Sequence, residues 1–565
     1  MIKEINALER NHTWDIVPLP PGKSALGCKW VFALRPDSSG NLTRFKARLV
    51  ARGDLQLDRE FHETFAPVAK FCSLKLILSI AAFHDLEVDQ GDFDSAFVNG
   101  SLDEEIYMSQ PPGFTNGQDG QKVLRLRKSL YGLKQAARIW YQTLDSLLKQ
   151  FNFKRVVVDY GVWVQHETNT LILAHVDDML LVGSRAVLDD LKPKINAVYA
   201  FKDLGPASLF LGIRITRDRT KKCIYLHQGQ YTSALLQKFN ITYPASTPLQ
   251  SLFFPSTSPS FDVSTYQGAI GSLLYLALGT RPDIAYAVIK LAQFSSNPSV
   301  AHWTAIRRTM AYLHGTMNYN IVLASSTEPP TLVGYFDSSY ADDINDRHST
   351  YGYVFYYMGG PVSWRSKKQQ VLALSSTEAE YISATEAAKE SQWIVSFLSE
   401  IGYPLKYTTL YRDNKGANSL VLNLMYHSRT KHIDIRFRYV TELSEAGAIK
   451  IEHCTTKKMI ADILTKPLAK DTFQNLRHLL GVLPNHEAGI NIESPTAIDA
   501  NPHSKKRGGT SLPPYICNKC NSSYSSRNAL FNHLQNTGHF NDNDTTTTVI
   551  TVSTIFSSPT AGTGQ

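Results

Sequence analysis

Cysteine is scarce in this chain, which contains six cysteines in 565 residues. Four of the six stand singly and far apart, namely Cys28, Cys72, Cys223 and Cys454. Small secreted domains that depend on disulfides carry cysteines densely and in even sets, so this distribution argues against a disulfide framework. It favours a reducing, intracellular compartment, either the cytoplasm or the nucleus.

Long apolar runs are missing as well. No stretch approaches the roughly 20 apolar residues of a membrane-spanning helix, and the first residues lack the apolar core of a secretory signal. We therefore expect no membrane partner. Positive charge is only slightly in excess. The chain has 58 Lys and Arg residues and 50 Asp and Glu residues, which gives a formal net charge of +8. A basic balance favours an acidic partner, of which nucleic acid is the commonest.

What is present is a long, mixed composition typical of soluble globular domains. Hydrophobic residues make up 43% and aromatic residues 11% of the chain. A chain of this length exceeds what a single hydrophobic core supports, so several domains are expected.

Residues 171–183 carry the strongest local signal. Two apolar runs flank Asp177 and Asp178, which predicts a β-hairpin with two carboxylates at its tip. Asp is also a good turn residue, so a purely structural role stays open at this point. Adjacent carboxylates at a rigid tip repel each other unless a cation lies between them. A functional interpretation therefore requires a divalent metal ion and a further carboxylate from elsewhere.

Candidates for the further carboxylate follow a predicted buried helix at residues 73–86. Three acids stand there within six residues, Asp89, Asp92 and Asp94. The sequence pattern alone does not choose among them.

Two basic stretches favour contact with nucleic acid. Residues 28–34 and 44–52 predict a hairpin whose returning strand alternates basic with apolar residues, including Lys46 and Arg48. These two side chains suit phosphates, although charge also protects an edge strand. Residues 125–142 predict a basic loop and helix with interleaved aromatics, a mixture that suits stacked bases, although a solvated basic helix face is the alternative.

These stretches together resemble the reverse transcriptase of copia-type (LTR) retrotransposon Pol polyproteins. The matching motifs come in that family's order and at its spacing: Trp30-Val-Phe, Phe45-Lys-Ala-Arg-Leu-Val-Ala-Arg-Gly, Phe65-Ala-Pro-Val-Ala-Lys, Asp92-Phe-Asp-Ser-Ala-Phe, Ser129-Leu-Tyr-Gly-Leu-Lys-Gln-Ala and Val176-Asp-Asp. The resemblance covers about residues 14–470. It implies a polymerase of right-hand palm and fingers architecture that acts on an RNA template, a DNA primer and deoxynucleoside triphosphates.

The resemblance also implies the catalytic groups. Asp92, Asp177 and Asp178 would hold two Mg²⁺ (or Mn²⁺) ions about 4 Å apart, the arrangement that stabilises the attacking and leaving oxygens of phosphoryl transfer. The backbone carbonyl of Phe93 would assist them. Phe97 matches the bulky position that would clash with a ribose 2′-hydroxyl and so favour deoxynucleotides.

Four further residues are implied as nucleotide contacts. Arg35, Lys46 and Arg48 would hold the triphosphate, and Gln135 would lie near the incoming nucleotide. One departure from the family matters for activity. His175 stands where the family has a Tyr that packs under the primer end, and it predicts altered activity.

A second set of acids is spread over residues 331–470. Asp337 and Asp413 end predicted strands, Glu378 opens a long predicted helix behind a Ser/Thr cap, and Asp462 lies early in a predicted final helix. Each acid alone is compatible with capping or surface charge. As a set they are what a two-metal nuclease requires, and they resemble the ribonuclease H domain of the same polyproteins. The resemblance implies two Mg²⁺ ions and cleavage of the RNA strand of an RNA–DNA hybrid.

The last recognisable motif is a short Cys/His module. Cys517, Cys520, His533 and His539 follow the spacing C-x2-C-x12-H-x5-H, which resembles a Cys2His2 zinc finger. A module this short cannot bury enough surface alone, so Zn²⁺ is expected to supply its folding energy. Its target stays open between DNA, RNA and protein.

The expected fold class is therefore α+β and multidomain. We expect a reverse transcriptase at 1–240, a linker and helical, thumb-like connection at 241–330, and a ribonuclease H-like α/β domain at 331–470. A linker at 471–512, a small ββα zinc finger at 513–540 and a disordered tail at 541–565 would follow.

Two functions are compatible with this organisation. One is an RNA-directed DNA polymerase with ribonuclease H activity from a truncated copia-type element. The alternative is a degenerate transposon remnant that acts at most as a zinc-dependent module binding nucleic acid or protein.

Overall fold

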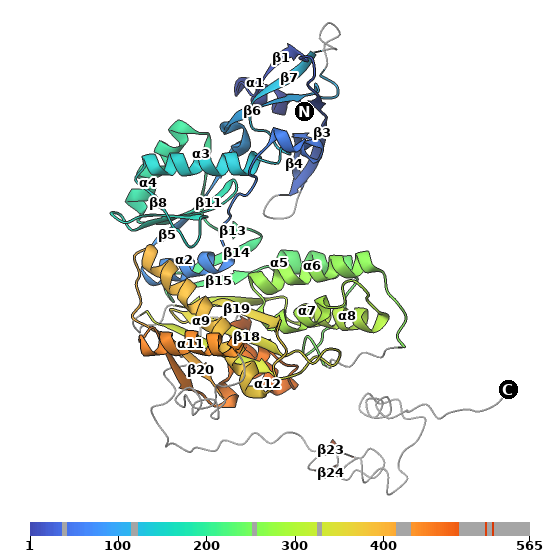
Figure 1. Cartoon of the computed structure of the whole chain (residues 1–565), viewed down its shortest axis with the longest axis vertical. Helices are drawn as coiled ribbons and strands as arrows, with labels where there is room; N and C mark the ends of the chain where they lie inside the picture. Colours follow the sequence, from blue (N-terminus) through green and yellow to red (C-terminus); the bar gives the residue numbers. More distant parts are fainter. Residues whose placement is uncertain are drawn as a thin grey trace, which may run out of the picture. The chain divides into compact units, whose positions relative to one another are not determined.

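The structure is a computed structural model of the chain (Figure 1), and it describes residues 1–36, 42–114, 122–250, 257–324, 330–413, 431–484, 515–516 and 523–524. The chain divides into two compact units, Met1–Ile498 and Asp499–Gln565, and each is described by itself. Within the described ranges, no helix combines the length and hydropathy needed to cross a bilayer.

The first part of unit 1 holds a small sheet and a separate long hairpin. Its elements are α1 (Ile2–Arg10), β1 (Trp14–Pro18), β2 (Ala25–Leu26), β3 (Cys28–Pro36), β4 (Leu42–Ala51), η1 (Gly53–Leu55), η2 (Asp58–Glu60), β6 (Ser101–Met108) and β7 (Lys122–Lys128). The sheet has the order β1-β7-β6-β2, and β3 pairs with β4 in the predicted basic hairpin. Leu8, Leu49 and Leu126 bury themselves in one core that joins helix, hairpin and sheet.

A six-stranded sheet with helices on both faces forms the second part of unit 1. Its elements are α2 (Phe71–Phe83), β5 (Glu87–Phe93), η3 (Ala96–Asn99), α3 (Ala136–Gln150), β8 (Lys154–Arg155), β9 (Val162–Gln165), β10 (Thr170–His175), β11 (Asp178–Gly183), α4 (Arg185–Val198) and β12 (Phe201–Pro206). The strand order is β12-β5-β11-β10-β9-β8. Successive residues of a strand point to opposite faces. Leu180 and Val182 accordingly join the core with α2, while Met179 and Leu181 join the core with α3 and α4.

Several helices follow this sheet, in the stretch expected to form a helical connection. The elements here are β13 (Leu209–Phe210), β14 (Ile213–Asp218), β15 (Cys223–His227), α5 (Gly229–Lys238), α6 (Val263–Gly279), η4 (Pro282–Ile284), α7 (Ala285–Ala292), α8 (Val300–Gly315) and β16 (Tyr319–Ala324). Arg281 and Asp283 form a buried ion pair at 2.8 Å, and the hydroxyl of Tyr312 donates to Asp283 at 2.6 Å. Buried charges need such partners, and this network joins α8 to η4.

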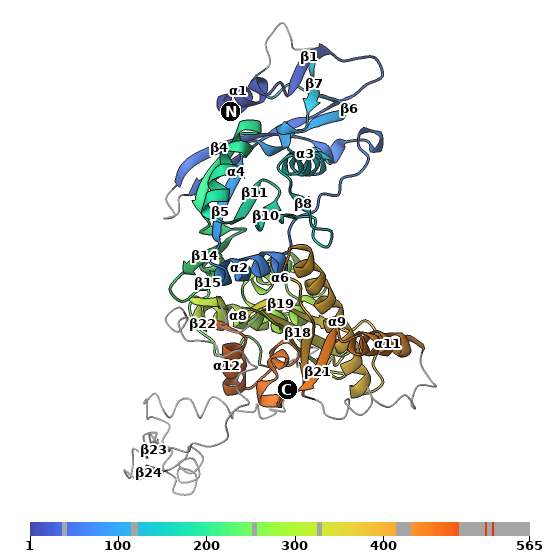
Figure 2. The same ribbon diagram turned by 90° about the vertical axis from the view of Figure 1, so that its left-hand side faces the viewer.

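The last part of unit 1 is a five-stranded sheet with two long helices. Its elements are β17 (Leu332–Ser339), β18 (Thr350–Tyr357), β19 (Gly360–Lys368), α9 (Ser376–Glu400), β20 (Thr408–Arg412), α11 (Lys431–Glu445), β21 (Ile449–His453), η6 (Thr456–Lys458), η7 (Ile460–Leu464), α12 (Lys470–Leu479) and β22 (Val482–Pro484). The order is β19-β18-β17-β20-β21, with β17, β20 and β21 parallel. Helix α9 packs on β17 and β18, and α11 packs on α9 (Figure 2).

Three stretches differ from the sequence-based expectation. Residues 471–484, expected to be linker, belong to α12 and β22, because Phe473 and Leu476 bury an apolar face within a mostly polar helix. Strand β22 joins the sheet β13-β14-β15-β16-β22 by pairing with β16. Asp462 lies in the 3-10 turn η7 and not in an α-helix; Pro467 follows shortly after and disfavours helical backbone before it. Residues 125–128, expected in a loop, belong to strand β7.

In unit 2 the structure describes one short hairpin. Strand β23 (Tyr515–Ile516) pairs antiparallel with β24 (Ser523–Tyr524). The predicted zinc ligands Cys517, Cys520, His533 and His539, like the predicted tail at 541–565, lie outside the described residues.

Candidate active sites

The predicted carboxylate hairpin is confirmed. β10 and β11 pair antiparallel with His175 opposite Asp178, so Asp177 and Asp178 lie at the turn and at the start of the returning strand. β11 also pairs with β5, where Asp178 stands directly opposite Asp92. Asp92, which is distant in sequence, therefore lies beside the adjacent pair Asp177 and Asp178.

The tip of this hairpin is held in an unusual backbone conformation. Val176 has φ of +62°, a left-handed conformation that is disfavoured for a β-branched residue. The indole Nε1 of Trp140 donates to the carbonyl of Val176 at 2.7 Å, and the amide of Phe93 donates to the carbonyl of Asp177 at 3.3 Å. Trp140 comes from α3 and Phe93 from β5, so two other elements set the position of the tip.

The three carboxylates repel one another. Burial, followed by the charges of Asp177 and Asp178, raises the pKa of Asp92 to about 6. The positive charge of Lys46, on β4 of the basic hairpin, acts in the opposite direction. Negative charge thus concentrates at the site, with a cationic side chain from the basic hairpin close enough to compensate part of it.

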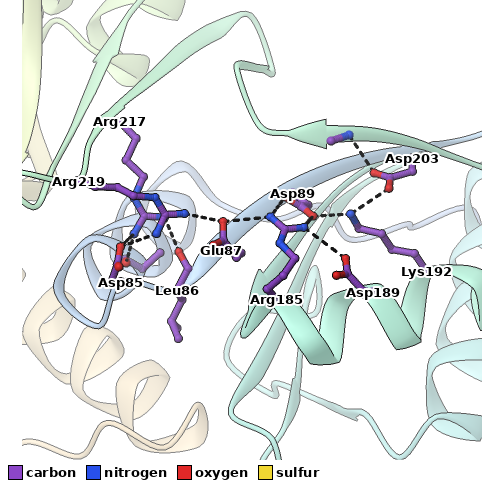
Figure 3. A network of polar contacts seen from close by, with 12 residues as sticks. Asp85, Leu86, Glu87, Asp89, Arg185, Asp189, Lys192, Asp203, Arg217 and Arg219 are labelled. Carbon is purple, nitrogen blue, oxygen red and sulfur yellow. Dashed lines mark hydrogen bonds and ion pairs between the residues drawn. The ribbon is translucent and has the colours of Figure 1, made fainter.

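The structure distinguishes Asp92 from its two acidic neighbours. Asp89 is fully buried and pairs with Arg185 at 2.6 Å and with Lys192, both from α4 (Figure 3). Burial opposes ionisation of Asp89, but hydrogen bonds from these two cations hold its pKa below the usual value. Its charge is already compensated, so its role is structural. Asp94 is exposed beyond the end of β5.

Aromatic and cationic side chains lie near Asp177. The ring of Tyr131 lies 4.7 Å from the ring of Phe97 in an edge-on arrangement, and the guanidinium of Arg48 stands 5.0 Å above the Tyr131 ring. Burial raises the pKa of Tyr131; Arg48 opposes this rise and Asp177 adds to it. Tyr131 therefore lies between Phe97, Arg48 and the carboxylate cluster: its ring contacts Phe97 and Arg48, and the charge of Asp177 acts on its hydroxyl.

The second set of acids also converges. Asp337 on β17, Glu380 on α9 and Asp462 in η7 are buried, and Asp413 follows the end of β20. Burial raises the pKa of Glu380, and the charges of Asp337 and Asp413 raise it further. Burial and Asp337 likewise raise the pKa of Asp462. A second concentration of negative charge therefore lies at one end of the parallel strands.

Sequence comparison decides the family. A family model described as reverse transcriptase (RNA-dependent DNA polymerase) matches residues 11–251. The transposon Ty5-1 protein of Saccharomyces cerevisiae is 35% identical over 307 residues, which are 53% of this chain and 99% of that one. The chain belongs to the Pol polyproteins of copia-type retrotransposons and carries their reverse transcriptase domain.

A longer member extends the match through most of this Pol chain. The retrovirus-related Pol polyprotein from transposon TNT 1-94 of Nicotiana tabacum is 41% identical over 501 residues, covering 86% of this chain and 38% of that one. The chain thus spans well under half the length of that relative. Among solved structures, a foamy viral protease-reverse transcriptase in complex with an RNA/DNA hybrid is similar at 13% identity and a TM-score of 0.47. That similarity covers 82% of this chain and 54% of the other.

One acid of the second set in this Pol chain requires correction. Glu378, predicted as a metal ligand, caps its own helix: its carboxylate accepts from the amide of Leu374 at 2.7 Å, and its amide donates to the Ser375 hydroxyl at 3.1 Å. The charges of Asp337 and Asp413 act instead on Glu380. The sequence pattern already left this capping role open, because a Glu three residues after an N-cap Ser is the usual partner of that cap.

The structure does not place all predicted nucleotide contacts at the carboxylate cluster. Gln135 is buried. Its side-chain carbonyl accepts from the side-chain amide of Gln56 at 3.1 Å, and its side-chain amide donates to the backbone carbonyl of Glu60 at 3.0 Å. These hydrogen bonds hold the preceding loop and occupy the groups with which Gln135 would contact a nucleotide. Four residues earlier in the same motif, Tyr131 lies close enough to Asp177 for that charge to raise its pKa. The Arg35 side chain lies outside the described residues.

The Phe93 side chain belongs to the core. Its ring packs against Trp140 at 4.9 Å and Phe201 at 5.1 Å between ring centroids. Only its backbone is therefore available to the site. The predicted role of its carbonyl stays a prediction.

Divalent cations suit the chemistry of the first cluster. Among the described residues, no group of three His, Cys, Asp or Glu side chains already converges as closely as a metal site. The mutual repulsion that raises the pKa of Asp92 nevertheless is what a bound cation relieves, and hard carboxylate oxygens are the ligands that Mg²⁺ prefers. The donor set fits Mg²⁺ or Mn²⁺.

Proposed function

We propose that this Pol chain is an RNA-directed DNA polymerase that extends a DNA primer on an RNA template with deoxynucleoside triphosphates. The observation that carries the proposal is the meeting of Asp92, Asp177 and Asp178 on hydrogen-bonded neighbouring strands, with the pKa of Asp92 raised to about 6 by burial and their repulsion. Family membership supports the same reaction.

Each group near the cluster has a chemical task in this proposal. Asp92, Asp177 and Asp178 would hold two Mg²⁺ or Mn²⁺ ions, which neutralise charge on the attacking and leaving oxygens when bound. Lys46 and Arg48 neutralise the triphosphate, since both sit on the basic hairpin that faces the carboxylates. Arg35, from the same hairpin, is a further candidate for this task.

Selection of the sugar falls to two aromatic side chains. Phe97 presents a ring where a ribose 2′-hydroxyl would lie, and its edge-on contact with Tyr131 fixes the orientation of that ring. Exclusion by a rigid ring discriminates better than exclusion by one that can rotate away.

Primer extension on an RNA template with Mg²⁺ tests the proposal. An Asp177→Asn/Asp178→Asn double variant is expected to lose extension, while Asp190→Asn, an exposed acid-to-amide change on α4 of the same domain, keeps it. Equal product from the wild type and the double variant would mean that the signal is background and that the proposal is wrong.

We further propose that the second cluster is a ribonuclease H site. Asp337, Glu380, Asp413 and Asp462 would hold two Mg²⁺ ions, which activate a water for attack on the RNA strand of an RNA–DNA hybrid. A 2′-hydroxyl and A-form geometry identify that strand. Cleavage of a labelled hybrid by the full chain should disappear in Asp337→Asn and persist in Asp177→Asn/Asp178→Asn. Loss in both variants would contradict separate sites.

The Cys/His module of unit 2 is proposed to bind one Zn²⁺ through Cys517, Cys520, His533 and His539. The β23–β24 hairpin supports this, because it brackets the two cysteines as the two strands of a ββα finger would. Zinc content of the full chain should fall by one equivalent in Cys517→Ser/Cys520→Ser.

The module also carries the competing function. If the chain shows no metal-dependent extension or cleavage, yet binds DNA, RNA or a protein in a zinc-dependent way, the degenerate-remnant interpretation replaces the polymerase. The motivating observation is His175, which pairs with Asp178 at the hairpin where the family has Tyr.

A further inference from the structure

A lysine lies inside the second carboxylate cluster. The Nζ of Lys466 is 2.9 Å from the carboxylate of Asp462 and 3.5 Å from that of Asp337. These two carboxylates are only 5% and 4% exposed, whereas the Lys466 side chain is 35% exposed. The ammonium therefore reaches inward from a partly solvated stem to two buried acids.

The same turn supplies all the contacts. The hydroxyl of Thr465 donates to the Asp337 carboxylate, and the amides of Thr465 and Lys466 both donate to the carbonyl of Asp462 at 3.2 Å. One short segment thus provides an acid of the cluster, a hydroxyl donor and a cation. Its backbone hydrogen bonds fix the direction from which the cation enters.

A cation is needed here whether or not a metal is bound. Several buried carboxylates at close range destabilise the folded chain unless they take up protons or a positive charge. Lys466 supplies such a charge from within the chain. A lysine suits a place that must sometimes be vacated, because its ammonium is a compact charge on a flexible stem.

We propose that Lys466 is an internal cation that stands in for a divalent metal ion between Asp337 and Asp462 and withdraws when the metal binds. This rests on the proposed ribonuclease H function of the cluster. An ammonium and a metal ion repel each other and compete for the same carboxylate oxygens. Metal binding must therefore break the ion pairs of Lys466 with Asp462 and Asp337. The free energy needed to break them lowers the metal affinity of the site.

The test measures Mn²⁺ binding without nucleic acid. All proteins are full-length and carry Asp177→Asn/Asp178→Asn, so that the polymerase carboxylates do not contribute. Lys466→Met, which keeps the apolar stem and removes the charge, is compared with Lys457→Met, an exposed lysine of η6 in the preceding turn. Calorimetric titration with Mn²⁺ should show about tenfold tighter binding for Lys466→Met and no change for Lys457→Met.

Thermal unfolding gives a second readout that a merely structural lysine would not produce. In EDTA, Lys466→Met should unfold at a lower temperature than the background protein. With saturating Mn²⁺ the difference should vanish, because the metal then supplies the charge in both proteins. Lys466→Gln repeats both measurements in case the methionine variant fails to fold.

Three outcomes overturn the proposal. One is equal Mn²⁺ affinity with and without Lys466. Another is a stability deficit of Lys466→Met that is the same at every Mn²⁺ concentration. The third is a Lys466→Met protein that binds Mn²⁺ as before but binds the RNA–DNA hybrid more weakly, which would make Lys466 a phosphate contact. Failure of the nuclease proposal looks different: Mn²⁺ then binds neither the background protein nor Lys466→Met, and the wild type does not cleave a hybrid.

Discussion

Replacing Asp92 by asparagine is expected to stabilise the metal-free protein at neutral pH while abolishing primer extension. In the folded chain, burial and the charges of Asp177 and Asp178 raise the pKa of Asp92 from 3.8 to about 6. A tenfold change in an acid dissociation constant corresponds to about 1.4 kcal/mol, so this rise in pKa is worth about 3 kcal/mol. Because Asp92 is only partly buried, solvent screening reduces the expected effect to about 1–1.5 kcal/mol.

The sign of the pH dependence follows from the direction in which the pKa moves. A raised carboxyl pKa means that the folded chain retains a proton which the unfolded chain releases. Stability is therefore greatest below the unfolded pKa of 3.8, falls as pH rises, and carries the whole penalty above the folded pKa of about 6. Asparagine cannot ionise, so the advantage of Asp92→Asn should be small at about pH 4 and complete at about pH 7.5.

Urea unfolding in EDTA, followed by tryptophan fluorescence, measures this advantage at both pH values. The first transition is compared between variants, because a chain of several domains need not unfold in one step. Asp94→Asn, an exposed acid two residues along the chain, is the matched control; its charge adds the smallest contribution to the raised pKa of Asp92, so the change should stabilise much less than Asp92→Asn. Added Mg²⁺ should stabilise the wild type more than Asp92→Asn, in which only the second cluster keeps its full set of carboxylates. A variant that is less stable at about pH 7.5, or equally stabilised at both pH values, would refute the repulsion on which the site rests.

Further perturbations separate the roles of neighbouring side chains. Phe97→Val should increase ribonucleotide incorporation about tenfold or more relative to deoxynucleotides in primer extension; unchanged discrimination would remove Phe97 from the sugar site. Trp140→Phe leaves the Val176 carbonyl without its donor, which should cost about 1–3 kcal/mol in urea unfolding. It should also slow extension but not hybrid cleavage; equal losses in both assays would indicate general destabilisation. Glu380→Gln should abolish hybrid cleavage, whereas Glu378→Gln should retain it and lose about 1 kcal/mol of stability as a weakened cap; the reverse pattern would restore Glu378 as the ligand.

Local pattern was sufficient for the carboxylate hairpin. Two short apolar runs around Asp177 and Asp178 predict two strands and a turn, and the structure has β10, β11 and that turn. The choice among Asp89, Asp92 and Asp94 was not a local property. Asp89 is not a candidate ligand because Arg185 and Lys192 compensate its charge. These cations lie 96 and 103 residues further along the chain, so the sequence around Asp89 does not reveal them.

Two site residues were misplaced for different physical reasons. Glu378 and Glu380 are two residues apart on one helix, so they face different directions, and the choice depends on which side packs against β17. The cap signal around Ser375 left a capping role for Glu378 open but did not decide between the two glutamates. Gln135 was misplaced because the motif 129–136 leaves a loop and enters a helix, and spacing alone does not tell which of its side chains turns inward. Burial of the Gln135 amide and the closeness of Tyr131 to the carboxylates answer that question.

The pairing of β22 with β16 makes the part of the chain that carries the first carboxylate cluster depend on the segment that follows the second cluster. Every acid of the second cluster lies between these two strands in sequence, yet Ile321 and Val482 are direct neighbours in the same sheet. A premature stop codon between β16 and β22 would therefore delete part or all of the second cluster or, at the least, uncover the edge of β16. An uncovered strand edge is a template for aggregation. Loss of the last part of the gene would thus endanger the solubility of what remains, and selection on the first cluster would help to keep the second one in the reading frame.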